Sequence, residues 1–166
     1  MLEPWAEISE RLRRIYPMQQ YVINGYRMSP QQRRVWSQVS EDHTLKVQCA
    51  LLLEGAVHQE ALKRAVFTAV EQHEILRATF DRMPGFKLPA QIVAESMAPS
   101  WRALDLSGES DDRQRAEIDS LFEQERWLRC DYRRGPLLGC TLVKLSDKRH
   151  VILIDLPALC ADALMD

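Results

Sequence analysis

The chain has 166 residues, of which 46% are apolar and 28% charged, and its 22 Lys and Arg nearly balance its 24 Asp and Glu. This composition is typical of a globular protein with one domain-sized core, and the balanced charge argues against nucleic-acid binding. No apolar run approaches the roughly 20 residues of a membrane span, and the N-terminus lacks the apolar core of a secretory signal. We therefore expect a cytoplasmic protein that binds neither nucleic acid nor membrane.

Cysteine and histidine spacing gives no sign of a metal site. The four cysteines, at positions 49, 130, 140 and 160, lack CxxC spacing, and the four histidines are not paired at ligand spacing. These patterns are not those of a zinc site or a disulfide framework. We expect buried, reduced thiols, no metal ion and no cofactor bound directly by the chain.

Residues 1–25 are predicted to form a helix and a linker ahead of the domain. The apolar stripe of this helix is narrow and consists of Trp5, Ile8, Leu12 and Ile15. The segment 16–27 contains proline, asparagine and glycine and is typical of a linker. The helix either packs on its own domain or is a connector or docking helix for another module.

Helix and strand signals then alternate along residues 26–166. Ser29 before Pro30 predicts a helix start. Apolar pairs every four residues predict a helix over Glu60–His73, and Asp111–Leu128 is a second long helix that buries Trp127 and Leu128. Strands are predicted at 47–53 (buried), 77–82, 90–93, 100–104, 137–145 and 150–156, and a last helix at 159–165. The pattern indicates an α+β fold, a mixed β-sheet covered on one face by two or three long helices.

Three stretches, in this order, resemble motifs of nonribosomal peptide synthetase condensation domains. Residues 28–36 (MSPQQRRVW) are similar to S-x-A-Q-x-R-L-W, residues 71–80 (EQHEILRATF) to R-H-E-x-L-R-T-x-F, and residues 134–138 (RGPLL) to G-P-L-L. The matching residues of the first two are Ser29, Gln32, Arg33, Trp36, His73, Glu74 and Arg77. The resemblance implies that 26–166 form the N-terminal lobe of a two-lobed, chloramphenicol-acetyltransferase-like fold, and that the C-terminal lobe is absent from this sequence.

The resemblance also places the family's catalytic motif, H-H-x-x-x-D-G, on residues 157–163. Aligned on Asp162, Pro157 and Ala158 take the places of the two histidines, and Ala163 takes that of the glycine. In the family the second histidine orients or deprotonates the acceptor amine, which requires a basic atom within hydrogen-bond reach. The retained Asp162 is implied to be structural, held by an arginine ion pair for which Arg77 is a candidate.

Neighbouring residues are weak substitutes for the histidines. Cys160 has no adjacent cation or base to lower the pKa of its thiol, so we favour an inert, packed side chain over a nucleophile. Asp155 is either a carboxylate base or, as we favour, an edge or capping residue. His73 is expected to support the structure, and His150 to face solvent.

We favour a truncated or partial condensation-like lobe that is non-catalytic by itself, because the family's reaction takes place in a tunnel between two lobes. Its role would be structural, linking or recruiting, in the synthesis of a secondary metabolite such as an antibiotic or siderophore. The alternative is the first half of a catalytic amide- or ester-forming domain of a variant subfamily, which acts on carrier-protein thioesters by positioning them. A small binding domain unrelated to peptide synthesis is the third hypothesis.

The resemblance implies particular partners. These are other synthetase modules, adenylation domains and carrier (thiolation) domains, whose phosphopantetheine arm holds the substrate. The basic pairs Arg13/Arg14 and Arg133/Arg134 are either ordinary surface charge or a carrier contact. The surface left by the missing lobe is a candidate site of self-association.

Overall fold

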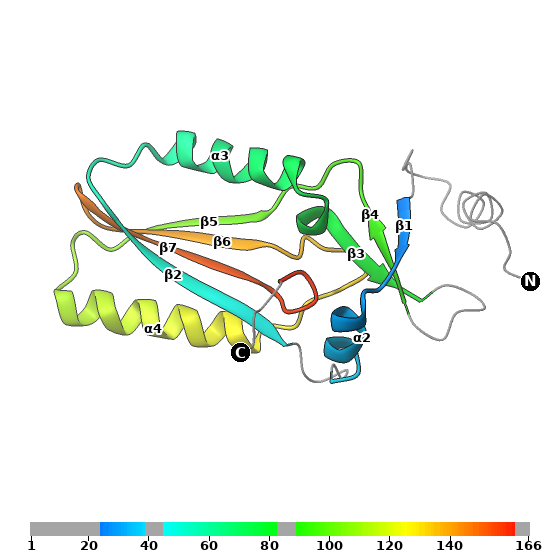
Figure 1. Ribbon diagram of the computed structural model, residues 1–166. Helices are drawn as coiled ribbons and strands as arrows, with labels where there is room; N and C mark the ends of the chain where they lie inside the picture. Colours follow the sequence, from blue (N-terminus) through cyan, green and yellow to red (C-terminus); the bar gives the residue numbers. More distant parts are fainter. Residues whose placement is uncertain (1–23, 39–44, 83–88, 162–166) are drawn as a thin grey trace, which may run out of the picture.

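A computed structural model of the chain describes residues 24–38, 45–82 and 89–161. The predicted N-terminal helix (4–16), Arg13, Arg14, Asp162 and Ala163 lie outside these ranges. Figure 1 shows an elongated molecule in which a small sheet and a short helix adjoin one end of a larger sheet.

The strands form two sheets. In the three-stranded sheet, β4 (Ala90–Val93) lies between β1 (Asn24–Arg27) and β3 (Ala78–Asp81), and all pairings are antiparallel. The four-stranded sheet has the order β2-β7-β6-β5, in which β5 is parallel to β6 and the other neighbours are antiparallel. Its strands are β2 (Lys46–Glu54), β5 (Ser100–Asp105), β6 (Gly139–Ser146) and β7 (Arg149–Pro157). The predicted α+β class with a mixed sheet is confirmed.

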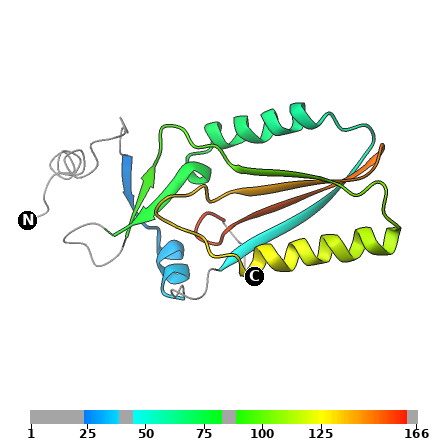
Figure 2. The same ribbon diagram turned by 180° about the vertical axis from the view of Figure 1, so that it is seen from behind.

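Two long helices, α3 (Gln59–Gln72) and α4 (Asp111–Trp127), cover the larger sheet, and the short helix α2 (Pro30–Trp36) lies near its end (Figures 1 and 2). The prediction that the helices share one face is wrong. Val70 of α3 packs on Cys140 of β6, whereas Leu121 of α4 packs on Val143 of the same strand. Residues 140 and 143 point to opposite sides of a strand, so α3 and α4 lie on opposite faces. The long apolar runs of β6 and β7 reflect burial on both sides.

Local signals in the sequence account for the helix starts. Ser29 caps α2, accepting from the Gln32 amide at 3.1 Å, while the Gln32 side chain accepts from the Ser29 amide at 2.8 Å. This capping box, with Pro30 in the first turn, fixes the start as predicted. Asp111 and Asp112 open α4, where negative charge suits the helix dipole.

Four local predictions are wrong. Asn24–Arg27, predicted as linker, pairs with β4 as strand β1. Leu159 and Cys160, predicted to begin a helix at 159–165, lie instead in the turn 158–160 after Pro157. Trp127 and Leu128 are 68% and 58% exposed, because they stand at the end of α4. The strand at 47–53 exists as β2, but it is not buried, since it lies at an edge of the sheet.

Candidate functional site: the turn after β7

The motif positions lie in a turn whose backbone is anchored at several points. The Ala158 amide donates to the Leu45 carbonyl at 2.8 Å, and the Cys160 amide donates to the Pro157 carbonyl at 2.8 Å. The Leu159 carbonyl accepts from Gln32 Nε2 at 3.2 Å, and this amide also donates to Gln91 at 2.9 Å. Gln32, a residue of the first matching motif, therefore ties α2 to the turn.

An apolar cluster holds the turn from beneath. Leu159 is 2% exposed and packs with four other buried side chains, Met28, Phe80, Leu137 and Cys160. Trp36 and Tyr132 pack at its border, with ring centroids 5.7 Å apart in an edge-to-face arrangement. Burial of this much apolar surface fixes the position of the turn. Residues of all three matching stretches, Met28, Phe80 and Leu137, thus meet at this turn.

The turn offers no basic atom at the position of either histidine. Pro157 is buried, and Ala158 presents only a methyl group. Of the four histidines, His43 lies outside the described residues. His58 caps the start of α3, His73 caps its end and is exposed, and His150 stands at the opposite end of β7. At the described positions of the turn, nothing can accept a proton from an amine.

Cys160 does not replace the missing bases. Its thiol is buried, and this burial raises its pKa to about 12, with a smaller contribution from the nearby Cys130. A thiol must lose its proton to act as a nucleophile. At neutral pH Cys160 is therefore a packing side chain, the role that we favoured from the sequence.

Arg77 lies where the second motif leads into β3. Its Nη1 donates to the carbonyls of Ala94 and Glu95, and its Nη2 is 4.0 Å from Glu74. Its Nε is buried and has no hydrogen-bond partner among the described residues. Because Asp162 lies outside these residues, the ion pair between Arg77 and Asp162 stays a prediction.

A buried ion pair was missed from the sequence. Lys46 Nζ, in a side chain only 5% exposed, lies 3.1 Å from Asp155 Oδ2, 2.8 Å from the Glu125 carbonyl and 3.8 Å from its carboxylate. A Cβ atom at position 139 would collide with the Asp155 carboxylate, so Gly139 makes room for it. Asp155, two residues before Pro157, is thus paired with Lys46. The only signal in the sequence was the glycine that follows the G-P-L-L stretch.

The remaining matching residues and the basic pair Arg133/Arg134 have structural positions or lie at the surface. Arg33 is exposed on α2, and Glu74 starts the short 3₁₀ helix Glu74–Arg77. Arg133 and Arg134 are 68% and 88% exposed and contact Asp81 and Asp131 at 3.2 and 3.8 Å. The basic pair therefore remains available to a partner.

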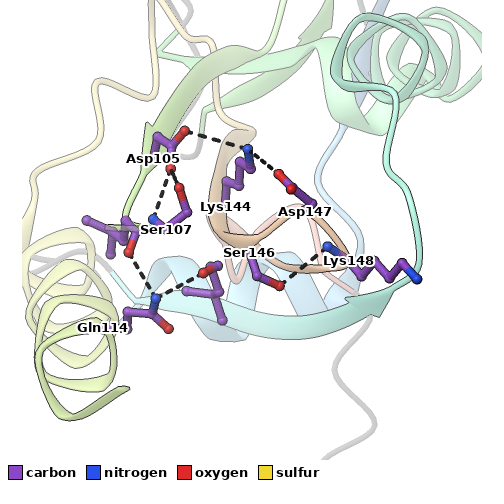
Figure 3. A network of polar contacts seen from close by, with 9 residues as sticks. Asp105, Ser107, Gln114, Lys144, Ser146, Asp147 and Lys148 are labelled. Carbon is purple, nitrogen blue, oxygen red and sulfur yellow. Dashed lines mark hydrogen bonds and ion pairs between the residues drawn. The ribbon is translucent and has the colours of Figure 1, made fainter. Parts of the chain in front are cut away.

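The opposite end of the sheet carries a polar network (Figure 3). Lys144 Nζ bridges Asp147 at 2.9 Å and Asp105 at 3.9 Å, and the Asp105 carboxylate accepts from Ser107. The predicted exposure of His150 is wrong. It is 6% exposed and helps line a cavity of about 250 Å³ next to Lys144, because its side chain points to the face that α3 covers.

Hydrogen bonds and a nearby cation hold the carboxylate pKa values of this network low. Hydrogen bonds from Ser107 lower the pKa of Asp105, and the ion pair with Lys144 lowers that of Asp147. Both carboxylates are therefore charged at neutral pH.

Of the four cysteines, Cys140 and Cys160 are buried. Burial raises the pKa of Cys140 and of the partly buried Cys130 to about 11. Cys49 is exposed on β2, contrary to the expectation of four buried thiols. Residues 24–38, 45–82 and 89–161 contain no cluster of three side chains that could hold a metal ion. Their helices are too short or too polar to cross a membrane.

The chain is similar to peptide synthetases over most of its length. It is 34% identical over 140 residues to surfactin synthase subunit 2 of Bacillus subtilis (strain 168), covering 82% of this chain and 4% of that protein. It is 35% identical over 114 residues to tyrocidine synthase 2 of Brevibacillus parabrevis, covering 68% of this chain and 3% of that protein. The chain thus spans a few per cent of the length of these relatives.

Solved structures show the same fold. The starter condensation domain of rhizomide synthetase matches with a TM-score of 0.70 at 18% identity, over 82% of this chain and 34% of that one. The first condensation domain of the calcium-dependent antibiotic synthetase matches with a TM-score of 0.69 at 20% identity, over 80% of this chain and 32% of that one. The family model of the condensation domain matches residues 22–164. The chain therefore belongs to the condensation-domain family of nonribosomal peptide synthetases, of whose solved domains it spans about a third.

Proposed function

We propose that this chain is a condensation-type lobe that does not itself form amide bonds. It has a structural, linking or recruiting role among the modules of a nonribosomal peptide synthetase in the cytoplasm. The turn after β7 carries this proposal, because Ala158 has only a methyl group where the family keeps its second histidine.

Loss of the base supports a non-catalytic role. General-base catalysis contributes about 10²–10⁴-fold to a rate, and Cys160, with a pKa of about 12, does not supply it. The chain's sheets, helices and apolar cluster nevertheless form without the catalytic histidines.

The partners that we propose are carrier domains, with adenylation domains and other modules beside them. No cofactor is bound by this lobe itself, and phosphopantetheine belongs to the partner carrier. Arg134 is 88% exposed and stands next to Arg133, so the pair presents positive charge to a phosphate or an acidic carrier surface. Contacts of this kind are weak and salt-dependent.

An amide-formation assay tests the proposal. The chain is incubated with a donor and an acceptor carrier, both charged with amino acids on phosphopantetheine, and the carriers are weighed by intact-protein mass spectrometry. We expect no dipeptidyl carrier, because no base reaches the acceptor amine. An active condensation domain with both histidines is the positive control, and its variant with alanine at the second histidine is the matched negative one.

The outcomes separate the two hypotheses. Turnover by this chain would refute the non-catalytic role. Amide formation by a longer protein that contains this sequence would support the variant catalytic domain, provided that it survives Asp162→Ala and requires loaded carriers.

A further inference from the structure

The strand β2 leaves one long side of the larger sheet open. It has nine residues, and over the part of the chain that the structure describes it pairs only with β7. In Figure 1 it runs along the border of the sheet, with α4 on one face. Unpaired backbone groups on such an edge are a template for another strand.

The hydrogen bonds to β7 show which groups point outward. The Ala158 amide donates to the Leu45 carbonyl, and the Gly55 amide donates to the Lys148 carbonyl. Both pairs continue the β2–β7 register by one residue, one pair at each end. In an antiparallel pair the hydrogen-bonded residues alternate, so the odd-numbered residues of β2 face β7. The amides and carbonyls of the even-numbered ones, 46, 48, 50, 52 and 54, face away from the sheet.

The side chains of β2 do not protect this edge. Leu51 and Leu52 are 46% and 54% exposed, on opposite faces, and residues 47–53 contain no charge, proline or bulge. In natural proteins, a charge, a proline or a bulge in an edge strand hinders its pairing with a strand of another chain. The opposite edge, β5, is shorter and carries Arg102 and Asp105. Of the two edges of the larger sheet in the described residues, β2 is therefore the one that combines length, apolar side chains and open backbone groups.

The charges at the two ends of β2 indicate what pairs with it. Lys46 and Glu54 flank the uncharged stretch. If two copies of β2 pair antiparallel about Ala50, every outward amide and carbonyl finds a partner. The same register sets Lys46 opposite Glu54 of the second copy. Because Lys46 Nζ stays bound to Asp155 at 3.1 Å, the benefit is the absence of like-charge repulsion rather than a new ion pair.

The apolar side chains also match in this register. Cys49 stands opposite Leu51 of the second copy, and Val47 stands opposite Leu53. These are non-hydrogen-bonded pairs, in which side chains approach most closely. We propose that β2 pairs antiparallel with β2 of a second copy of this chain, centred on Ala50, to join two four-stranded sheets into one. The proposal does not depend on the proposed function.

The oligomeric state tests the proposal directly. Analytical ultracentrifugation of the chain should show a reversible shift from 19.3 kDa toward twice that mass as the concentration rises. We expect a dissociation constant of roughly micromolar or weaker, because a single strand pair buries little surface. Ala50→Lys places two ammonium groups at the two-fold axis and should abolish the dimer. Ala103→Lys, a matched change at an exposed alanine of β5, should leave it intact.

A cross-link tests the register. Leu51→Cys places a thiol opposite Cys49 of the second copy, with Cα atoms about 4.5 Å apart, which is within disulfide range. Under mild oxidation this variant should form a covalent dimer on non-reducing gels. Leu53→Cys, which stands opposite Val47, is the control that should not cross-link.

A chain that stays monomeric at all concentrations would overturn the proposal. A dimer that survives Ala50→Lys would do the same, since its interface would lie elsewhere. A longer synthetase fragment that is monomeric while the Ala50 and Leu52 amides exchange slowly with solvent would show that β2 takes an intramolecular strand, which also overturns it.

Discussion

The two ends of β7 differ in their chemistry. At the Pro157 end, the family's motif positions are held in an apolar cluster, and the one titratable group in the described turn is the buried Cys160 thiol. At the Arg149 end, Lys144, Asp147 and His150 help to line a cavity, and Asp105 lies 3.9 Å from Lys144. The motif end therefore keeps the architecture of its family without the two histidines, and the charged groups near it, Lys46 and Asp155, are paired with each other. A second group of charged side chains lies at the far end of β7, where the motif predicts none.

Thiol reactivity is expected to show the largest effect at the motif end. With a pKa of about 12, only about one Cys160 thiol in ten thousand is ionised at pH 8, whereas Cys49 is exposed. Raising the pH increases the fraction of Cys160 side chains that are thiolates. At pH 8 and low concentration, iodoacetamide should alkylate Cys49 much faster than Cys160, measured for each cysteine by peptide mass spectrometry.

The unfolded protein is the control for this experiment. In urea, the two cysteines should react at similar rates. Equal rates in the folded protein would show that the turn is open and that its thiol is available for chemistry.

Packing of the turn is tested by Leu159→Ala. Leu159 is 2% exposed in the apolar cluster, so its truncation leaves a cavity and should cost about 2–5 kcal/mol of unfolding free energy, measured by urea titration. Leu52→Ala, at a leucine 54% exposed, is the matched control and should cost about 0.5 kcal/mol or less. Equal costs would mean that the turn does not depend on its apolar anchor.

Gln114→Ala tests the polar end with a smaller expected effect. The buried Gln114 side chain donates to the carbonyls of Leu106 at 2.9 Å and Leu145 at 3.0 Å (Figure 3). Its removal leaves buried carbonyls without a donor, and we expect a loss of about 1–3 kcal/mol in the same titration. Gln124→Ala, on the exposed side of the same helix, should change stability little. A neutral Gln114→Ala would show that water replaces this side chain.

Sequence periodicity determined most elements because their causes are local. The capping residue Ser29, the apolar repeat of α3 and the acidic start of α4 act within a few residues, so each helix was predicted to within a residue or two. The ordered motifs also indicated the family. The replacement of both histidines by Pro157 and Ala158 is likewise legible in the sequence alone.

Tertiary structure alone decided which surfaces are buried and which charges meet. The apolar composition of β2 predicts burial, but its place at the edge of the sheet leaves Leu51 and Leu52 exposed. Lys46 and Asp155 are 109 residues apart in sequence, and the register of β2 against β7 brings them together. Alternation along one strand cannot specify its neighbours, since strand order and helix placement depend on contacts between distant segments. For the same reason, the sequence did not show that α3 and α4 cover opposite faces.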